Sequence, residues 1–264
     1  MLALENIQCA YGKKNVIHGI DLHVNKAEVV SILGANGSGK STLLKAIVGL
    51  LPYSGAIRIQ STLVEKLKRV ERAALIAYVP QMSSIPFDFS VLEVVLMGRF
   101  HTSSFGFNYA KEDKDLAYRS LEKVGMSAFS KQAFKNLSGG ERQLVLIARA
   151  LAQQSSIIVM DEPVTGLDLG NQMRLLDLIS TLAQEGYTIL QTTHYPDHAL
   201  RVSHKVAWIA HGKMLAYGEP QEVVTVERIL EVYGVASEMF QHASGVHHLL
   251  PLGFLPKECL CGLS

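Results

Sequence analysis

The order of apolar and polar positions indicates an α/β arrangement in the first part of the chain. The first thirty residues alternate loosely in short runs broken by Gly and Asn, which predicts hairpin-like strands leading into a buried strand at Val29–Leu33. Apolar residues at helical spacing follow from Leu43 to Leu51 and stop at Pro52. Two short strands are predicted next, in the segments SGAIRIQ and LIAYVPQ.

The middle of the chain, roughly residues 87–153, has little strand pattern. It holds three helical segments, SVLEVVLMGR, KEDKDLAYRSLEKVG and GGERQLVLIARALAQ. Buried strands then return in SIIVMDE and YTILQTTH, with a helix between them and two strand-like pieces near VAWIAHGKMLAYG. Continuous apolar strands that alternate with helices predict right-handed βαβ units in a parallel sheet.

These patterns predict one domain over residues 1–240. Its α/β core is formed by residues 1–86 and 154–240, and an α-helical subdomain is inserted at about 87–153. The pattern weakens beyond Gly234, and we expect residues 241–264 to form a C-terminal appendage.

Composition narrows the possible classes of protein. At 264 residues, with 48% hydrophobic and 19% charged residues, the chain can bury a large core and is not of the disordered type. Twenty-five basic and twenty-four acidic residues argue against a dedicated nucleic-acid surface. We expect no membrane span and no signal peptide. The odd count of three cysteines, Cys9, Cys259 and Cys261, favours a reducing compartment, and hence a cytoplasmic protein.

The segment GANGSGKS, from Gly34 to Ser41, matches the phosphate-loop pattern G-x-x-x-x-G-K-[ST]. Its glycines allow backbone amides to approach phosphate oxygens at the start of a helix. Lys40 is expected to reach the β- and γ-phosphates, and the Ser41 hydroxyl to bind Mg²⁺. The motif lies between a buried strand and an amphipathic helix, which is the context that phosphate binding requires.

Acidic and imidazole groups are expected at the same edge of the sheet. Asp161 and Glu162 follow a buried apolar strand, and His194 ends another. In open α/β sheets ligands bind at the carboxyl ends of the strands. Asp161 suits a Mg²⁺ contact because this ion takes hard oxygen ligands, and Glu162 is placed to polarise an attacking water.

The stretch LSGGE, residues 137–141, is a second candidate for anion binding. Ser138 and Glu141 have the spacing of a capping box at the start of a helix. A capping box does not call for Gly139 and Gly140, which weaken a helix unless something must approach its backbone closely.

Seven motifs occur in one order: Tyr11, the phosphate loop, Gln81, LSGGE, IIVMDEP, GLD at 166–168, and His194. This set closely resembles the ATP-binding subunit of ATP-binding cassette (ABC) transporters, over about residues 2–235. The resemblance implies an α/β P-loop NTPase fold, with a RecA-like core, an N-terminal antiparallel β part and an inserted α-helical subdomain. It also implies ATP hydrolysis, with ATP and Mg²⁺ as cofactors.

The resemblance further assigns roles to individual residues. Tyr11 is similar to the aromatic that stacks on adenine, Gln81 to the glutamine that senses Mg²⁺ and the γ-phosphate, and Asp168 to the aspartate that communicates across a dimer. Glu162 resembles the general base, and His194 the histidine that contacts the γ-phosphate. The implied catalytic set is Glu162, His194, Lys40 and Gln81, and the implied Mg²⁺ set is Ser41, Gln81 and Asp161. The implied ATP-binding set is Tyr11, Gly34, Ala35, Asn36, Gly37, Ser38, Gly39, Lys40, Ser41, Thr42, Ser138, Gly139, Gly140 and Asp168.

The resemblance also implies partners. In this family LSGGE binds the γ-phosphate of ATP held by another subunit, so we expect a head-to-tail dimer that sandwiches two ATP molecules. Two membrane-spanning permease subunits are expected as partners, with a substrate-binding protein acting indirectly and no nucleic acid. The expected location is the cytoplasmic face of the inner membrane, where the subunit would be peripheral.

Further segments, such as VLMGRFHTSSFGF, GLDLGNQ and THYPDHAL, are similar to the importer ATPases for ferric siderophores, haem and cobalamin. The expected function is therefore to energise such an importer. An exporter ATPase and a soluble, non-transport ABC ATPase remain open as alternatives. His247 and His248 with Cys259 and Cys261 lack a standard zinc spacing, and we expect them to lie in a flexible tail.

Overall fold

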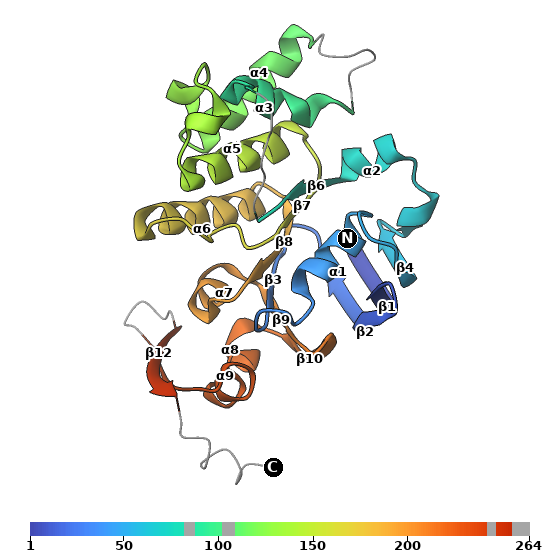
Figure 1. The fold of residues 1–264 in the computed structure, drawn as a ribbon, viewed down its shortest axis with the longest axis vertical. Helices are drawn as coiled ribbons and strands as arrows, with labels where there is room; N and C mark the ends of the chain where they lie inside the picture. Colours follow the sequence, from blue (N-terminus) through green and yellow to red (C-terminus); the bar gives the residue numbers. More distant parts are fainter. Residues whose placement is uncertain (82–87, 102–108, 242–246, 255–264) are drawn as a thin grey trace.

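The computed structural model describes residues 1–81, 88–101, 109–241 and 247–254. Figure 1 shows a central sheet, a second sheet beside it, a helical lobe at one end of the molecule and a small hairpin at the other. Among the described residues, no helix is long and apolar enough to cross a membrane.

The second sheet is antiparallel and is built largely from the start of the chain. Its strands lie in the order β2-β1-β4-β5. The strands are β1 (Leu2–Tyr11), β2 (Lys14–Val24), β4 (Ser54–Ile59) and β5 (Thr62–Leu63). The expected N-terminal hairpin is thus confirmed, since β1 and β2 pair directly.

The central sheet has six strands in the order β10-β9-β3-β8-β7-β6. They are β3 (Val29–Leu33), β6 (Ile76–Val79), β7 (Ile157–Met160), β8 (Thr188–Thr193), β9 (Lys205–Ala210) and β10 (Lys213–Gly218). Neighbouring strands are parallel except for β10, which pairs antiparallel with β9. The prediction of a mainly parallel sheet is therefore confirmed.

Both faces of the central sheet are buried, as the continuous apolar strands predict. In β7, Ile158 and Met160 pack into the core that includes the helical lobe, whereas Ile157 and Val159 pack toward the antiparallel sheet. The sheet separates the two cores, and a single strand contributes to both because its successive side chains point to opposite faces.

The helices divide between the core and the lobe. Around the sheets lie α1 (Lys40–Ile47), α2 (Arg69–Leu75), α6 (Leu169–Gln184), α7 (Pro196–Val202), α8 (Pro220–Val223) and α9 (Val226–Tyr233). The lobe contains α3 (Val91–Leu96), α4 (Lys111–Lys123) and α5 (Gly139–Ala152). Short 3₁₀ turns occupy Val64–Lys66, Met97–Arg99, Ser127–Phe129 and Phe134–Asn136.

The lobe is held together partly by a buried cation. The Arg99 side chain, 7% exposed, donates to the Asp113 carboxylate of α4 at 2.8 Å and to the Ala152 carbonyl at the end of α5 at 3.0 Å. A buried guanidinium needs such partners, because an unpaired charge in the interior is strongly unfavourable.

The C-terminal part is more ordered than its sequence pattern suggests. Strands β11 (Val235–Gln241) and β12 (His247–Phe254) form an antiparallel hairpin that packs on α7 and α9. The prediction that His247 and His248 belong to a flexible tail is wrong, since both lie in β12. The two cysteines of that prediction, Cys259 and Cys261, lie outside the described residues.

A third apolar cluster joins this hairpin to the central sheet. Trp208 of β9 is fully buried in it, in register with Leu33, the residue that ends β3. Leu249 of β12 belongs to the same cluster, and the Tyr233 ring meets the indole edge-on at a centroid distance of 5.8 Å.

Candidate functional site

The phosphate-loop segment joins β3 to α1, as its sequence context predicts. Its first residue must be glycine, because a β-carbon on Gly34 would lie 2.2 Å from the Ile209 carbonyl oxygen. Gly39 has a φ of 107° at the N-cap of α1, a conformation that L side chains rarely adopt. These constraints hold the loop close against β9 and turn it directly into the helix.

Lys40 lies on the inner side of this loop. Its Nζ donates to the carbonyl oxygens of Gly34 at 2.8 Å and Ala35 at 3.1 Å. The side chain is 5% exposed, and burial lowers its pKa, while the Glu162 and Asp161 carboxylates act in the opposite direction. The ammonium is therefore directed by the loop's carbonyls and held near two carboxylates.

A cavity of about 560 Å³ lies beside the loop. It gathers residues from β1, the phosphate loop, α1 and the ends of the central strands. Its lining consists of Tyr11, Val16, Asn36, Gly37, Gly39, Lys40, Ser41, Thr42, Gln81, Glu162, Thr165 and His194. All four residues of the predicted catalytic set thus lie around one cavity.

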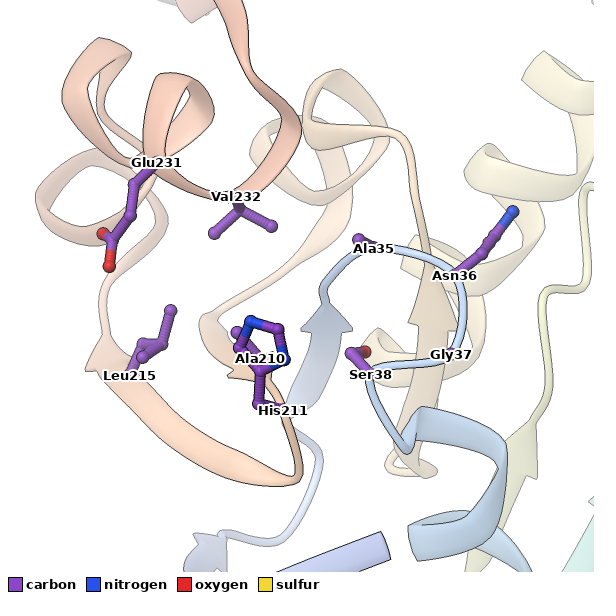
Figure 2. Close-up of a pocket in the computed structure, with 9 residues that line it drawn as sticks. All are labelled: Ala35, Asn36, Gly37, Ser38, Ala210, His211, Leu215, Glu231 and Val232. Carbon is purple, nitrogen blue, oxygen red and sulfur yellow. The ribbon is translucent and has the colours of Figure 1, made fainter. Parts of the chain in front are cut away.

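A second, smaller cavity of about 250 Å³ lies against another side of the same loop. Figure 2 shows the loop on the right of this cavity and Leu215 on the left, with His211 between them. Glu231 and Val232 of α9 lie above. Ala35 and Ser38, predicted to bind ATP, line this cavity, whereas Asn36 and Gly37 line both.

Asp161 is the more deeply buried of the two acids that follow β7, at 3% exposed against 8% for Glu162. Its Oδ1 accepts hydrogen bonds from the Ser41 hydroxyl at 2.9 Å and the Thr192 hydroxyl at 2.7 Å. Burial, followed by the effect of the nearby Asp161 carboxylate, raises the pKa of Tyr78. The hydroxyl predicted to bind Mg²⁺ and the carboxylate predicted to assist it are therefore direct neighbours.

Glu162 presents its carboxylate to the cavity. Oε2 accepts from Gln81 Nε2 at 2.9 Å and from the Thr165 hydroxyl at 3.1 Å, and His194 Nδ1 lies 3.3 Å from it. The other oxygen is 3.9 Å from Lys40 Nζ. Thr165 belongs to the same turn as Glu162, whereas Gln81, His194 and Lys40 come from three other segments of the chain, and all three contact this carboxylate.

The residues of LSGGE lie elsewhere. Ser138 caps α5, and the capping box is confirmed, since its hydroxyl accepts from the Glu141 amide at 3.3 Å while Glu141 Oε2 accepts from the Ser138 amide at 2.8 Å. A β-carbon built on Gly139 meets no described atom within 4 Å, and one on Gly140 meets only Leu167 Cδ2, at 3.0 Å. Packing among the described residues therefore gives no reason for glycine at position 139.

Asp168 is also outside the cavity lining. Its carboxylate caps α6 by accepting from the Asn171 amide at 2.8 Å, and it is exposed. Most of the predicted residues thus line the cavity or lie next to it, in the phosphate loop and at Asp161, whereas Ser138–Gly140 and Asp168 lie at helix starts away from its lining.

Three lining or supporting residues were not predicted from the sequence: Val16, Thr165 and Thr192. Thr192 has no exposed surface, and its hydroxyl accepts from the Glu162 amide at 2.8 Å while it donates to Asp161. The order of the strands contains a signal for it. Strands β7 and β8 are parallel neighbours that pair Met160 with Gln191, so the next residues, Asp161 and Thr192, lie side by side.

A phosphate loop at a strand–helix junction, with carboxylates at the ends of adjacent parallel strands, defines a P-loop nucleotide-binding protein. Residues 17–165 match the model of the ABC transporter family, and the chain belongs to that family. Like other members it binds nucleotide and is an ATPase.

Relatives in this family have been named for metal transport. The manganese transport system ATP-binding protein MntB of Bacillus subtilis is 37% identical over 236 residues, which cover 88% of this chain and 91% of MntB. The hemin import ATP-binding protein HmuV of Jannaschia sp. is 35% identical over 260 residues, 95% and 94% of the two chains.

Solved structures share the fold over most of the chain. One, from a transporter described as of the metal-chelate type in an inward-facing conformation, has a TM-score of 0.83 at 31% identity and covers 98% of both chains. Another, the dimeric structure of the bacterial ABC transporter cassette MJ0796, has a TM-score of 0.75 at 29% identity, with 83% of this chain and 99% of the other covered.

Proposed function

We propose that this ATPase energises an importer for metal-containing substrates of the ferric siderophore, haem or cobalamin kind, as a peripheral subunit at the cytoplasmic face of the inner membrane. The observation that carries the catalytic part is the convergence of Lys40, Gln81, Glu162 and His194 on one cavity. The hemin-import name of HmuV and the metal-chelate type of the structural neighbour support the class of cargo, and the manganese-transport name of MntB supports a metal-containing substrate more broadly.

In this proposal Glu162 acts as the general base. Hydrogen bonds from Gln81 and Thr165 hold its carboxylate at the cavity wall, where it orients a water for in-line attack on the γ-phosphate. The water oxygen forms the new bond to phosphorus, the bond from phosphorus to the β–γ bridging oxygen breaks, and Glu162 takes up the proton. Lys40 and His194 stabilise the charge that develops on the phosphoryl oxygens.

The residues present also fit a magnesium ion. The Ser41 hydroxyl and Asp161 carboxylate, 2.9 Å apart, are oxygen donors of the hard kind that Mg²⁺ prefers, and Gln81 lines the cavity that also contains Ser41. When bound there, the ion would neutralise charge on the phosphates.

The second part of the proposal is a head-to-tail dimer. Gly139 leaves open space at the positive end of α5, where free amides attract anions, and a β-carbon built there meets no atom of the described residues within 4 Å. We propose that the phosphates held by a second copy occupy this space. The dimeric structure of the related cassette supports the formation of a dimer.

A groove of about 830 Å³ supports the docking of permease subunits. It runs between α1, α2 and the helical lobe. Leu50 and Phe100 line it and are 66% and 45% exposed, so the groove presents two large apolar side chains that a partner could cover. The remaining lining residues are Val48, Gly49, Arg69, Arg72, Ala73, Ile76, Tyr78, Met97, Gly98, Arg149 and Gln153.

The function is tested by purifying the tagged chain from solubilised membranes and identifying the membrane subunit that accompanies it. Uptake of a ferric siderophore, haem, cobalamin and free manganese is then compared between cells with and without the gene. Loss of uptake of one metal chelate supports the proposal. Recovery of no membrane subunit, or loss of export instead of uptake, would overturn the importer assignment.

The groove is tested separately with Leu50→Asp. We expect this variant to lose the membrane subunit while its ATPase activity in solution stays near that of the wild type. Tyr118→Asp is the matched control, since Tyr118 is a large apolar residue, 43% exposed, on α4 and outside the groove lining. Retention of the membrane subunit by Leu50→Asp would count against the groove as the docking site.

A further inference from the structure

The C-terminal hairpin contacts the helix that follows His194. Figure 1 shows β12 next to α7, and the two elements pack against each other. The Leu249 amide of β12 donates to Asp197 Oδ1 at 2.8 Å, and this bond is partly buried. The Leu249 side chain, 8% exposed, joins the apolar cluster that contains Ala199 of α7 and Leu33 of β3.

The first turn of α7 carries aromatic rings that continue from His194. The centroid of the Tyr195 ring lies 4.0 Å from that of His194 and 4.7 Å from that of His198. The planes are tilted by 39° and 43° respectively. Tyr195 thus lies between the two imidazoles, and its ring restricts the directions in which the His194 ring can turn.

The position of His194 is otherwise weakly fixed. Its side chain is 30% exposed, and Nδ1 lies 3.3 Å from Glu162 Oε2 without hydrogen-bond geometry. A group that must meet a phosphoryl oxygen needs its position held closely, since a displacement of about 1 Å can cost roughly a hundredfold in rate. The ring contacts with Tyr195 supply a restraint that the hydrogen bonds do not.

We propose that Tyr195 and His198 are positioning residues for His194, and that the bond from Leu249 to Asp197 anchors them to the C-terminal hairpin. The inference rests on the proposed role of His194 in hydrolysis. It gives the hairpin a part in turnover, because a shift of β12 against α7 is transmitted through one helical turn to the histidine ring.

The first test compares steady-state ATP hydrolysis of Tyr195→Ala and Tyr195→Phe. Loss of the ring pairs in Tyr195→Ala should lower kcat about two- to tenfold, with KM for ATP near the wild-type value because the phosphate loop is unchanged. Tyr195→Phe keeps the ring and should retain wild-type kcat. Equal kcat values for wild type and Tyr195→Ala would overturn the inference.

The second test addresses the anchor with three variants. Asp197→Ala removes the acceptor of the Leu249 amide and should lower kcat, while Asp197→Asn keeps a carbonyl oxygen and should restore it. Asp177→Ala is the matched control. It removes an exposed carboxylate that pairs with Arg201 of α7 at 3.1 Å, and it should leave kcat unchanged. Equal losses in Asp197→Ala and Asp177→Ala would contradict a specific anchor.

His194→Ala separates this inference from the proposed function. If His194→Ala hydrolyses ATP like the wild type, the proposed role of His194 is wrong. If it is impaired, Tyr195→Ala added to it should lower turnover no further, because the positioned ring is gone. An additional loss in the double variant would show a general structural effect and overturn the positioning role.

A spectroscopic measurement completes the test. In ¹³C-histidine-labelled protein, the ring signal of His194, assigned by its absence in His194→Ala, should move in both Tyr195→Ala and Asp197→Ala. It should stay in place in Asp177→Ala. An unmoved His194 signal in Asp197→Ala would show that the hairpin bond does not reach the ring.

Discussion

The Thr192 hydroxyl accepts a hydrogen bond from the backbone amide of Glu162 at 2.8 Å. This bond fixes a residue that is itself unusual, because Glu162 has a φ of 46°, in the left-handed region that non-glycine residues seldom adopt. Such a conformation costs on the order of 1–3 kcal/mol and persists where the surroundings hold it. The same hydroxyl donates to Asp161, so one buried threonine orients both acids.

Thr192→Val should therefore impair both stability and turnover. Valine has the same shape but leaves the Glu162 amide and one Asp161 lone pair without this partner, which we expect to lower the free energy of unfolding by about 1–3 kcal/mol. Urea denaturation measures this change, and ATPase assays of the folded variant measure the loss of kcat.

Two variants control that experiment. Thr192→Ser keeps the hydroxyl and should retain most of the activity. Thr181→Val removes an exposed hydroxyl that bonds only to the preceding turn of α6 and should change stability little. A Thr192→Val protein with wild-type kcat would show that orientation of the acids does not limit hydrolysis.

Glu162→Gln is expected to bind ATP but to hydrolyse it about a hundred- to ten-thousandfold more slowly, because an amide cannot accept the proton of the attacking water. Its carbonyl oxygen can still accept from Gln81 and Thr165. Single-turnover hydrolysis and nucleotide-binding titrations measure the two effects, with the exposed Glu112→Gln as control. Normal hydrolysis by Glu162→Gln would mean that another group is the base.

Trans-complementation tests the composite site. A mixture of Lys40→Ala and Ser138→Arg subunits forms some dimers in which one site has an intact Lys40 from one chain and an intact Ser138 from the other. Each variant alone should be inactive, and the mixture should recover part of the wild-type ATPase activity. Complete inactivity in mixtures where mixed dimers are demonstrated would contradict the head-to-tail arrangement.

The lowered pKa of His198 predicts that the protein loses stability in mild acid. Burial lowers this pKa from the ordinary value of 6.5, and the His194 and Arg201 charges act in the same direction, whereas Asp197 raises it. The unfolded chain therefore takes up the proton first as the pH falls, and the free energy of unfolding decreases from about pH 6.5 down to the lowered pKa.

Thermal unfolding between about pH 7.5 and pH 5 measures this dependence. His198→Gln cannot titrate, so its stability should fall less steeply over that window than that of the wild type. His18→Gln, at an exposed position in β2, is the control. Parallel pH profiles for wild type and His198→Gln would show that this imidazole is not a source of the acid sensitivity.

Much of the site could be predicted from the sequence because its parts carry local patterns. The phosphate loop requires glycines at fixed positions, and the acids follow a continuous apolar strand, so Lys40, Ser41 and Asp161 were expected near one another. The structure places them together: Ser41 and Asp161 are in direct contact, and the Asp161 carboxylate is near enough to raise the pKa of Lys40 against the effect of burial.

Thr192 and the C-terminal hairpin show what such patterns miss. The sequence around a buried threonine such as Thr192 of β8 is the same whether its hydroxyl orients a catalytic group or only satisfies a backbone group. In β12 only Leu249 is buried among the eight residues, so the alternation that identifies a strand is absent. The contact of β12 with α7 depends on tertiary packing, which a one-dimensional periodicity does not contain.

Trp208 gives this protein an intrinsic optical probe. It is the only tryptophan in the sequence, it is fully buried, and it lies beside Leu33, the residue directly before Gly34. Its emission therefore reports on one place, the apolar cluster shared by the end of β3, α7 and the C-terminal hairpin. Excitation of Tyr233 should transfer energy to it, and separation of α9 or the hairpin from the sheet should shift its emission to longer wavelengths. Unfolding of this region can thus be followed by fluorescence without any added label.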